Sequence, residues 1–401
     1  MNLLNTLIQR IHFKKKISKV DAVIIYDLEE NLIKEWILKP IGITQIIVRN
    51  PTDIIISLSV IIFFIKNFKY VIGRRPWRRA RFVYEKSLID VYNPKLVITF
   101  RENESILSEV SKIDNNRKYY SIQNSMRHTF DAEVIPKSIF NDSNDTSFTL
   151  FAWRELDKVV YNEYSDFNCK IIPVGSLRAS VSSNYRPQLD GIQNKRYDLC
   201  FGSTVGGSTS PEQEIDYNAM SQIVVEHLKR YIAENDKSLV VSLRTHSEFE
   251  INFFKSILGN SAAIMPRNRF RTSSENYDYS TYHVMAKSEL IIFLASSVGH
   301  EAIGMGKKAL QIDYTKDNEY AHLYFDGFWQ LSNSSYEHFA ERVDLLLSMK
   351  TNDYRKKVKR HADYLVRYDP DEPTYIKIQK QIKQDLNIHD YSTKQTIVID
   401  G

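Results

Sequence analysis

The sequence predicts an α/β fold in which two domains of parallel sheet and helix follow one another. Short runs rich in β-branched and aromatic residues alternate with helical stretches, a pattern typical of parallel sheets covered by helices. The chain has 401 residues, more than the roughly 100–200 that usually share one core. A polar stretch near the middle, SVSSNYRPQLDGIQNKR, has the composition of a linker, and the alternation begins again after it.

The first half contains five expected strands with helical stretches between them. The most apolar run, Ile54–Ile65, is shorter than the ~20 residues that a membrane-spanning helix needs, and we predict that it forms a buried helix. The stretch Trp77–Val91 has the spacing of an amphipathic helix. The expected strands are Asp21–Asp27, Gln45–Val48, Lys95–Phe100, Lys118–Gln123 and Lys170–Val174.

The second half repeats this organisation, and helices are expected from about Tyr336 onwards. We predict an N-terminal domain over residues 1–182, a C-terminal domain over 183–335, and helices over 336–401 that pack back on the first domain. One long doubly wound sheet is the alternative, which the polar linker disfavours. The expected strands are Tyr197–Gly202, Leu239–Leu243, Ala263–Met265, Glu289–Leu294 and Lys308–Ile312.

The cysteine content and the first residues bear on where the protein works. Only Cys169 and Cys200 occur, so no disulfide framework is expected and a reducing cytoplasm fits. Residues 1–19 predict an amphipathic helix rather than a signal peptide, because apolar residues precede the charges and no small-residue cleavage site follows.

Two basic clusters lie in the first hundred residues, at Lys14–Lys19 and at Arg74–Arg81 around Trp77. Each is either a solvated basic surface or a contact with an anionic membrane surface. A nucleic-acid partner is not expected, because no nucleic-acid-binding motif accompanies the charge. We therefore predict a cytoplasmic protein, with peripheral association at the inner face of the cytoplasmic membrane as the functional interpretation of the clusters.

The strongest local motif is ELIIFLASSVGHEAIGMGKKALQID, residues 289–313. An apolar strand leads into Ser296 and Ser297, where helical spacing begins. The unbonded N–H groups and the dipole at such a helix start favour a phosphate, although either serine could simply cap the helix. Glu301, about a turn further on, is a candidate for accepting hydrogen bonds from ribose hydroxyls or is an ordinary first-turn acid.

Residues 240–250, VVSLRTHSEFE, place polar side chains at the carboxyl end of another strand. This edge is where open α/β sheets bind ligands. Arg244 can form paired bonds to a phosphate or carboxylate, and His246 can donate to a leaving phosphate. The two residues are therefore predicted to share one site with the serine pair.

The loop after the strand YDLCFG is rich in glycine and hydroxyl residues. It lacks both the GK[ST] ending of a P-loop and the spacing of a dinucleotide fingerprint. It is either a cover over the site or an inert connection, and its candidate residues are Gly202, Ser203 and Thr204. No DxD-like metal motif stands out at a strand end, so no metal site is predicted.

Strand ends in the first half carry a second set of polar groups. Group transfer to a hydroxyl needs a carboxylate or imidazole that takes its proton, or a carboxylate nucleophile. Glu102, which directly follows a strand, ranks first, and each candidate could instead be a solvated loop charge. The other candidates are Asp131, Glu133 and His128. The neighbouring loop residues are Gln123, Asn124, Ser125 and Arg127.

Four stretches resemble bacterial surface carbohydrate biosynthesis proteins: YEKSLIDVYNPKLVITFREN, YYSIQNSMRH, FAWRELD and IIPVGSLRAS. The resemblance covers about residues 80–315. It implies the GT-B architecture, in which two Rossmann-like domains face a central cleft and helices follow. It also implies a glycosyltransferase that builds a surface glycan such as O-antigen, capsule or lipopolysaccharide.

The second half is also similar to bacterial sialyl-, polysialyl- and Kdo-transferases. Ser296 and Ser297 match their Ser-Ser/Thr motif, whereas His246 matches their His-Pro motif only in part, because Ser247 replaces the proline. The loop at Gln123 has no carboxylate where those enzymes have an acidic motif, so another base or a retaining route is implied. This resemblance implies a CMP-linked donor such as Kdo, pseudaminic or legionaminic acid, and no cofactor or catalytic metal beyond that co-substrate.

Three alternatives remain open from the sequence. The donor could be a UDP- or GDP-linked sugar, or the enzyme could transfer a polyol phosphate. In a different class, the chain could be a non-catalytic glycan-assembly subunit that binds a nucleotide without turnover. If the protein is an enzyme, its expected partners are a nucleotide sugar and a glycan or lipid-linked glycan acceptor.

Overall fold

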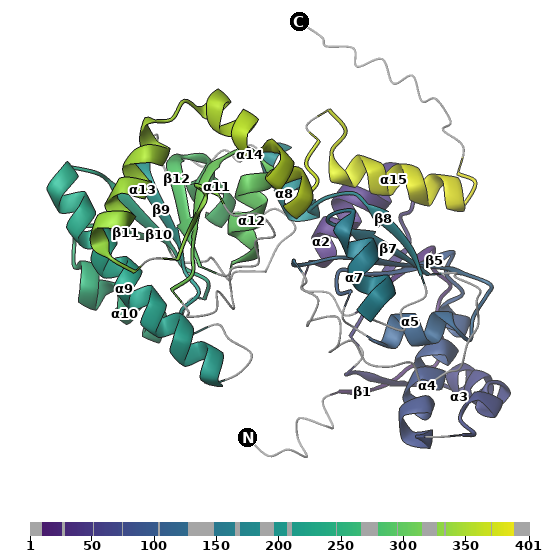
Figure 1. Ribbon diagram of the computed structural model, residues 1–401. Helices are drawn as coiled ribbons and strands as arrows, with labels where there is room; N and C mark the ends of the chain where they lie inside the picture. Colours follow the sequence, from purple (N-terminus) through teal and green to yellow (C-terminus); the bar gives the residue numbers. More distant parts are fainter. Residues whose placement is uncertain are drawn as a thin grey trace, which may run out of the picture.

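The computed structural model contains two parallel sheets, each surrounded by helices (Figure 1). It describes residues 10–388 except 26–28, 51, 74, 103–104, 127–147, 165–168, 185–195, 207–210, 246, 266–279, 295, 315–326, 333 and 370. With its parallel sheets and helical C-terminus, the chain has the mixed α/β, GT-B-like fold that the sequence predicts.

The first sheet has six parallel strands in the order β3-β2-β5-β6-β7-β8. Every residue of the interior strand β2 is buried, and its alternate side chains enter different clusters, Ala22 and Ile24 in one and Val23 and Ile25 in the other. The sheet is therefore covered on both faces, as expected for parallel strands. The strands are β2 (Ala22–Ile25), β3 (Ile46–Arg49), β5 (Leu96–Thr99), β6 (Lys118–Ile122), β7 (Phe148–Ala152) and β8 (Lys170–Pro173).

Helices from both ends of the chain cover the first sheet. Two short strands, β1 (Ile11–Phe13) and β4 (Ile54–Ile56), form a separate parallel pair beside it. The helices of this half are α2 (Glu30–Ile33), continued by the turns η1 (Lys34–Leu38) and η2 (Lys39–Ile41), α3 (Leu58–Lys66), η3 (Phe68–Tyr70), α4 (Pro76–Tyr92), α5 (Ser105–Ser111), α7 (Leu156–Tyr164) and α8 (Leu177–Asn184).

The second sheet is also parallel, in the order β11-β10-β9-β12-β13-β14. Its strands are β9 (Tyr197–Gly202), β10 (Leu239–Ser242), β11 (Ala263–Met265), β12 (Ser288–Phe293), β13 (Lys308–Ile312) and β14 (Gln330–Leu331). Its helices are α9 (Pro211–Asn235), α10 (Glu248–Leu258), α11 (Ser280–Ala286), α12 (Ser297–Gly304), α13 (Tyr336–Ser348) and α14 (Thr351–Leu365).

Both sheets reverse their strand order at one point. In the second sheet the chain runs from β9 to β10 and β11 on one side and returns to β12 on the other. The first sheet does the same between β2 and β5. Ligands of open α/β sheets bind beyond the carboxyl ends of the strands at such switch points.

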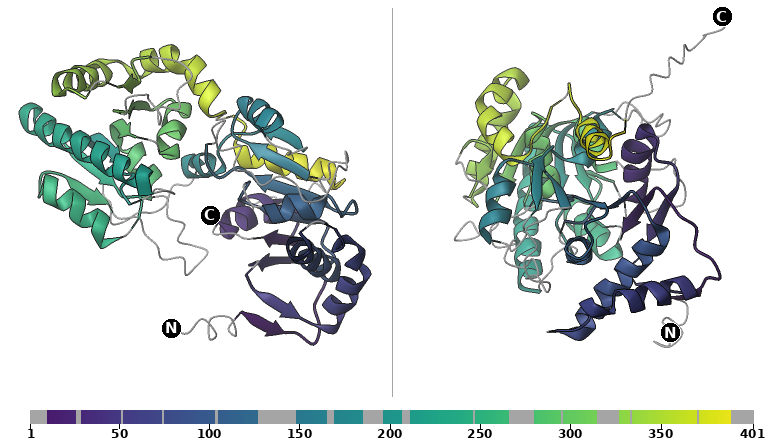
Figure 2. Two further views of the ribbon diagram at one scale, coloured as in Figure 1. Left: turned by 60° about the horizontal axis from the view of Figure 1, so that its bottom comes forward. Right: turned by 90° about the vertical axis from the view of Figure 1, so that its right-hand side faces the viewer.

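The last helix crosses back to the first half. Residues of α13 and α14 belong to the core of the second half, whereas Ile378 and Ile382 of α15 (Thr374–Asp385) are buried in the core of the first. The Tyr375 ring meets the Trp36 ring edge-on at 5.0 Å. Figure 2 shows α15, in yellow, lying against the first half. Of the three C-terminal helices, α15 is thus the one whose residues enter the core of the first sheet, whereas α14 touches this half through Tyr364, whose ring lies 5.9 Å from the Arg154 guanidinium.

The prediction of a buried helix over Ile54–Ile65 is wrong. Ile54–Ile56 form the strand β4, and the Ser57 hydroxyl, which accepts from Val60 N at 3.2 Å, starts the helix α3 only afterwards. Val60 is the buried residue of α3, and most of the helix faces solvent. No helix in the described ranges is both long and apolar enough to cross a bilayer.

The amphipathic helix expected over residues 1–19 is wrong in the part that the structure describes. Residues 1–9 lie outside the described part, but Ile11–Phe13 form β1, paired in parallel with β4. The sequence reading also missed β7, all of whose residues are buried, and the two-residue strand β14.

Candidate functional site

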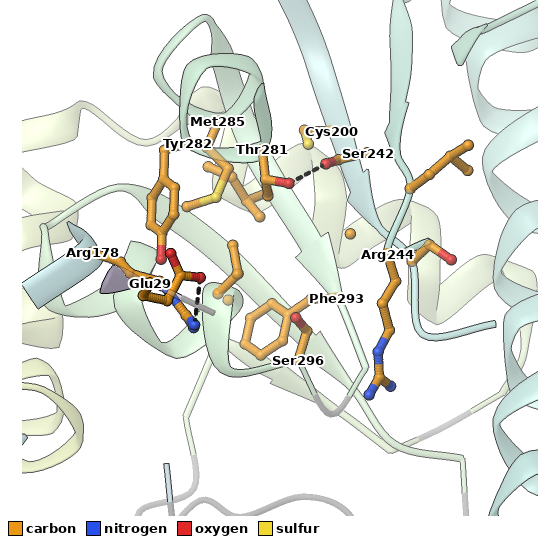
Figure 3. Close-up of a pocket in the computed structure, with 16 residues that line it drawn as sticks. Glu29, Arg178, Cys200, Ser242, Arg244, Thr281, Tyr282, Met285, Phe293 and Ser296 are labelled. Atoms are coloured by element: carbon orange, nitrogen blue, oxygen red, sulfur yellow. Dashed lines mark hydrogen bonds and ion pairs between the residues drawn. The ribbon is translucent and has the colours of Figure 1, made fainter. Parts of the chain in front are cut away.

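A pocket lies where the carboxyl ends of the two sheets meet (Figure 3). It encloses about 140 Å³, below the ~300–1,000 Å³ typical of a site for a whole small ligand, so it suits one charged group and its neighbours. Glu29, Arg178 and Tyr282 lie at one end and Arg244 at the other. The pocket is also lined by Gly202, Ser203, Phe293, Ser296 and Gly299.

The wall at the end of β10 is shaped by a buried carboxylate, Glu250. It accepts hydrogen bonds from Arg244 N at 2.8 Å, Thr245 N at 2.7 Å and the Ser203 hydroxyl at 2.5 Å. The Ser247 hydroxyl in turn caps α10 by accepting from Glu250 N at 3.2 Å. Glu250 therefore joins the loops after β9 and β10 and fixes the backbone from which Arg244 extends.

The sequence held a signal for Glu250 that the motif reading did not use. Ser247 and Glu250 have the S-x-x-E spacing of a capping box at the start of an apolar helix. In the structure the carboxylate turns to the preceding loop, so the capping signature also marks the residue that shapes the site. Of the predicted glycine-rich loop, Ser203 and Thr204 are buried and Gly202 is partly buried.

The start of α12 forms a second wall. Ser296 occupies the N-cap position with extended backbone, yet its side chain makes no capping bond. Gly299 packs against the Phe293 ring so closely that a Cβ atom there would lie 2.1 Å from a ring carbon. The first turn of α12 is thus pressed against the end of β12, with its N-terminus and the Ser296 hydroxyl at the pocket.

Glu301 lies deeper in the same helix and bridges the two halves. Its carboxylate accepts from the Tyr282 hydroxyl at 2.8 Å and from the Ser176 hydroxyl of the first half. Burial raises the pKa of Glu301, and the hydrogen bonds from Ser176 and Tyr282 and the charge of Arg178 offset this only in part. Its predicted contact with a ribose stays a prediction.

The first half contributes Arg178, a residue that the sequence reading did not select. Its guanidinium contacts Glu29 at 2.9 Å, donates to Asn124 O at 3.1 Å and lies 4.9 Å from the centre of the Phe100 ring. Burial alone would lower the pKa of Arg178, but the nearby Glu29, Tyr282 and Glu301 raise it overall. Arg178 therefore stays charged at the pocket.

Glu29 was not selected either, although it follows β2 at the switch point of the first sheet. The sequence offered one signal for Glu29 and Arg178, because each residue follows a strand. Arg178 lies in the stretch IIPVGSLRAS, directly after β8. The first half thus supplies a cation and a carboxylate to a pocket formed mainly by the second half.

Glu102 and the loop after β6 form a braced structure beside the pocket. Glu102 is 1% exposed and accepts from Asn124 N at 2.8 Å. The Gln123 amide accepts from Trp153 N at 2.8 Å and donates to Ser125 O at 2.9 Å. Glu102 does not line the pocket, so its observed contact is with the loop, and its catalytic role stays a prediction.

Ser125 and Ser297 meet across the two halves, with their hydroxyl oxygens 3.2 Å apart. Five predicted site residues lie outside the described ranges: Arg127, His128, Asp131, Glu133 and His246. Within the described part of the chain, no group of three His, Cys, Asp or Glu side chains could hold a metal ion.

The fold and the pocket define the protein by its architecture: two Rossmann-like halves meet at a polar junction, as in the GT-B fold. A family model described as "putative O-antigen biosynthesis protein" matches residues 120–383, more than half of the chain. The chain belongs to this family, which places it in surface carbohydrate biosynthesis. No curated protein sequence matches it.

Solved structures share the fold at low sequence identity. The UDP-GlcNAc 2-epimerase of Methanocaldococcus jannaschii, in complex with UDP-GlcNAc and UDP, is 14% identical with a TM-score of 0.52, covering 91% of this chain and 99% of that one. Another UDP-N-acetylglucosamine 2-epimerase is 12% identical with a TM-score of 0.54, over 93% and 98%. The wall teichoic acid polymerase TagF with CDPG is 13% identical with a TM-score of 0.53, over 92% and 89%.

Proposed function

We propose that this protein is a glycosyltransferase that moves a sugar from a nucleotide-activated donor onto a glycan or lipid-linked glycan acceptor during O-antigen assembly. The observation that carries the proposal is the start of α12, where the Ser296 hydroxyl makes no capping bond and lies in one pocket with Arg244. A helix N-terminus, a hydroxyl and a guanidinium are the groups that bind a phosphate.

The donor proposed is a CMP-linked ulosonic or nonulosonic acid of the Kdo, pseudaminic or legionaminic type. The Ser296-Ser297 match to CMP-sugar transferases supports it, and Arg178 offers a cation that an acidic sugar can use. UDP- and GDP-sugars and polyol phosphates are the competing donors. The similar solved structures are named for UDP-GlcNAc and CDPG. Their similarity to this chain concerns the fold and does not decide the donor.

In this proposal the second half stabilises the departing phosphate and the first half activates the acceptor. Arg244 and the α12 N-terminus face the negative charge that grows as the glycosidic bond to phosphate breaks. The carboxylate that the first half contributes to the pocket lining is Glu29, and we propose that it takes the acceptor proton or attacks the anomeric carbon. Glu102, Asp131, Glu133 and His128 remain alternative groups for this step. No cofactor is required beyond the co-substrate.

The phosphate site is tested by measuring nucleotide affinity in two variants. Arg244→Ala removes a charge-assisted bond worth about 2 kcal/mol, so affinity should fall by about thirtyfold, and Ser296→Ala should cost about fivefold. Calorimetric titration with CMP, UDP, GDP and CDP measures both.

Matched controls are Arg230→Ala, an exposed arginine on α9, and Ser348→Ala, an exposed serine at the end of α13. Both should bind like the wild type. If Arg244→Ala and Ser296→Ala also bind the preferred nucleotide within twofold of the wild type, the phosphate does not bind between Arg244 and the start of α12.

A further inference from the structure

The helix α3 turns its apolar stripe to the solvent. Leu58, Ile61, Ile62 and Ile65 have the i, i+3, i+4, i+7 spacing of one helix face, and they are 73%, 47%, 43% and 66% exposed. Such a stripe normally faces the core of a protein. Here the core side of α3 is supplied by Val60, so the stripe remains on the surface.

The exposed stripe continues into a larger surface, which we call the α3 face. Among the described residues, nine of the fourteen strongly exposed large apolar side chains fall between Phe13 and Trp77, so the exposure is concentrated and not scattered. Exposed apolar side chains gathered in one part of a protein in this way mark an interaction site. Besides the stripe, the α3 face includes Phe13, Ile54, Phe68, Ile72 and Trp77.

The α3 face is surrounded by positive charge. The sequence from Ile54 to Tyr84 contains no Asp or Glu but seven Lys and Arg residues. Lys14 N donates to Ile56 O at 2.9 Å, which brings the exposed run Lys14–Lys16 beside the start of α3. The exposed cations after the stripe are Lys66, Lys69, Arg75, Arg78 and Arg81.

The α3 face is held rigidly on the first half. The Asn67 amide donates to Asp90 at 3.0 Å, and the Tyr84 hydroxyl bonds both the N–H and the carbonyl of Ile55, at 2.6 and 3.0 Å. Figure 1 shows α3 and α4 at the lower end of this half, away from α15. The apolar and basic side chains are thus displayed on a fixed platform.

We propose that the α3 face docks on an anionic lipid bilayer. Nine residues of α3 extend roughly 14 Å, too short to cross a membrane but suited to lie in the interface with the apolar stripe among the acyl chains. Tryptophan side chains such as Trp77 favour the headgroup level of a bilayer. The surrounding Lys and Arg residues attract anionic lipids. The choice of lipid over a protein partner rests on the aliphatic stripe of α3 together with a segment, residues 54–84, that contains Lys and Arg but no Asp or Glu.

Vesicle flotation tests the proposal with phosphatidylcholine vesicles, with and without phosphatidylglycerol, at low and high salt. The wild type should bind the vesicles that contain phosphatidylglycerol and lose binding in high salt. Ile62→Glu/Ile65→Glu should weaken binding by more than about tenfold, because two acyl-buried side chains become charged. Arg78→Glu/Arg81→Glu should weaken it by at least about fivefold for each residue changed.

Matched controls carry the same changes elsewhere. Ile215→Glu alters an apolar residue that is 68% exposed on α9, and Lys356→Glu/Lys357→Glu alters exposed cations of α14. Both should float like the wild type. Circular dichroism and nucleotide titration of every variant separate lost docking from unfolding and from a failed donor site.

Two outcomes overturn the proposal. One is that the wild type binds neither kind of vesicle. The same holds if the control substitutions weaken vesicle binding as much as the substitutions in the α3 face do. The other is a protein that is dimeric by light scattering and becomes monomeric on Ile62→Glu/Ile65→Glu without vesicle binding in either form, since a second copy would then cover the α3 face.

Discussion

At the scale of single residues, the site depends on a few side chains that shape backbone rather than touch a ligand. Glu250 holds the loops that present Arg244 and Ser203. Gln123 and Glu102 hold the loop that presents Asn124 to Arg178. A motif search selects residues by their chemistry toward a ligand, which is why it found Arg244 and Ser296 but missed Glu250.

Removing the Glu250 carboxylate should loosen the loops after β9 and β10. Glu250→Ala leaves the N–H groups of Arg244 and Thr245 without their acceptor. Charge-assisted bonds contribute about 1.5–3 kcal/mol each, so the free energy of unfolding should fall by about 2–4 kcal/mol and nucleotide affinity should fall with it. Urea denaturation and titration measure the two effects.

The neighbouring Glu248→Ala is the control, because Glu248 is exposed on the same first turn of α10. It should change stability by less than about 1 kcal/mol. Equal stability and equal nucleotide affinity of Glu250→Ala and Glu248→Ala would refute the bracing role of Glu250.

At the scale of elements, the sequence predicts strands well where short apolar runs end in polar or glycine residues. The bounds of β9, β11 and β13 agree with the prediction. The prediction for Ile54–Ile65 failed because hydrophobicity alone cannot tell a core helix from one whose apolar stripe faces solvent, and because Ser57 divides the run into strand and helix. The strand β7 is buried throughout and shows no alternation that could reveal it.

The crossing from α14 to α15 depends on a glycine. Gly175 has φ +98°, and a Cβ atom there would lie 2.1 Å from the carbonyl oxygen of Arg367. Gly175→Ala must displace the crossing segment as well as adopt a strained backbone. It should lower the free energy of unfolding by about 3 kcal/mol or more, whereas strain alone costs about 1–2 kcal/mol.

Gly42→Ala separates the two contributions. Gly42 has φ +82° with no atom within 4 Å of an added Cβ, so it carries the strain without the clash. Urea denaturation of both variants gives the difference. Equal losses at the two positions would mean that the close approach of Arg367 is unimportant for joining α15 to the first half.

At the scale of the whole molecule, two parallel sheets present their switch points to one pocket. Ser176 with Glu301 and Ser125 with Ser297 join the halves at this junction. The two-sheet pattern and the strand-end residues were predictable from sequence because they depend on local spacing. Contacts between residues more than a hundred positions apart, such as Ser176 with Glu301, follow from the packing of the halves and have no local sequence signal.

The most direct test of the account is a transfer assay with the purified protein. It combines CMP-, UDP-, GDP- and CDP-activated donors with a lipid-linked glycan acceptor and measures both the released nucleotide and the mass of the glycan product. We expect one donor class to be consumed with a matching mass gain in the acceptor. Glu29→Gln and Arg244→Ala should each lower the rate by about a hundredfold or more. Epimerisation of the donor without any gain in acceptor mass, or nucleotide binding without turnover of any donor, would contradict the proposed glycosyl transfer.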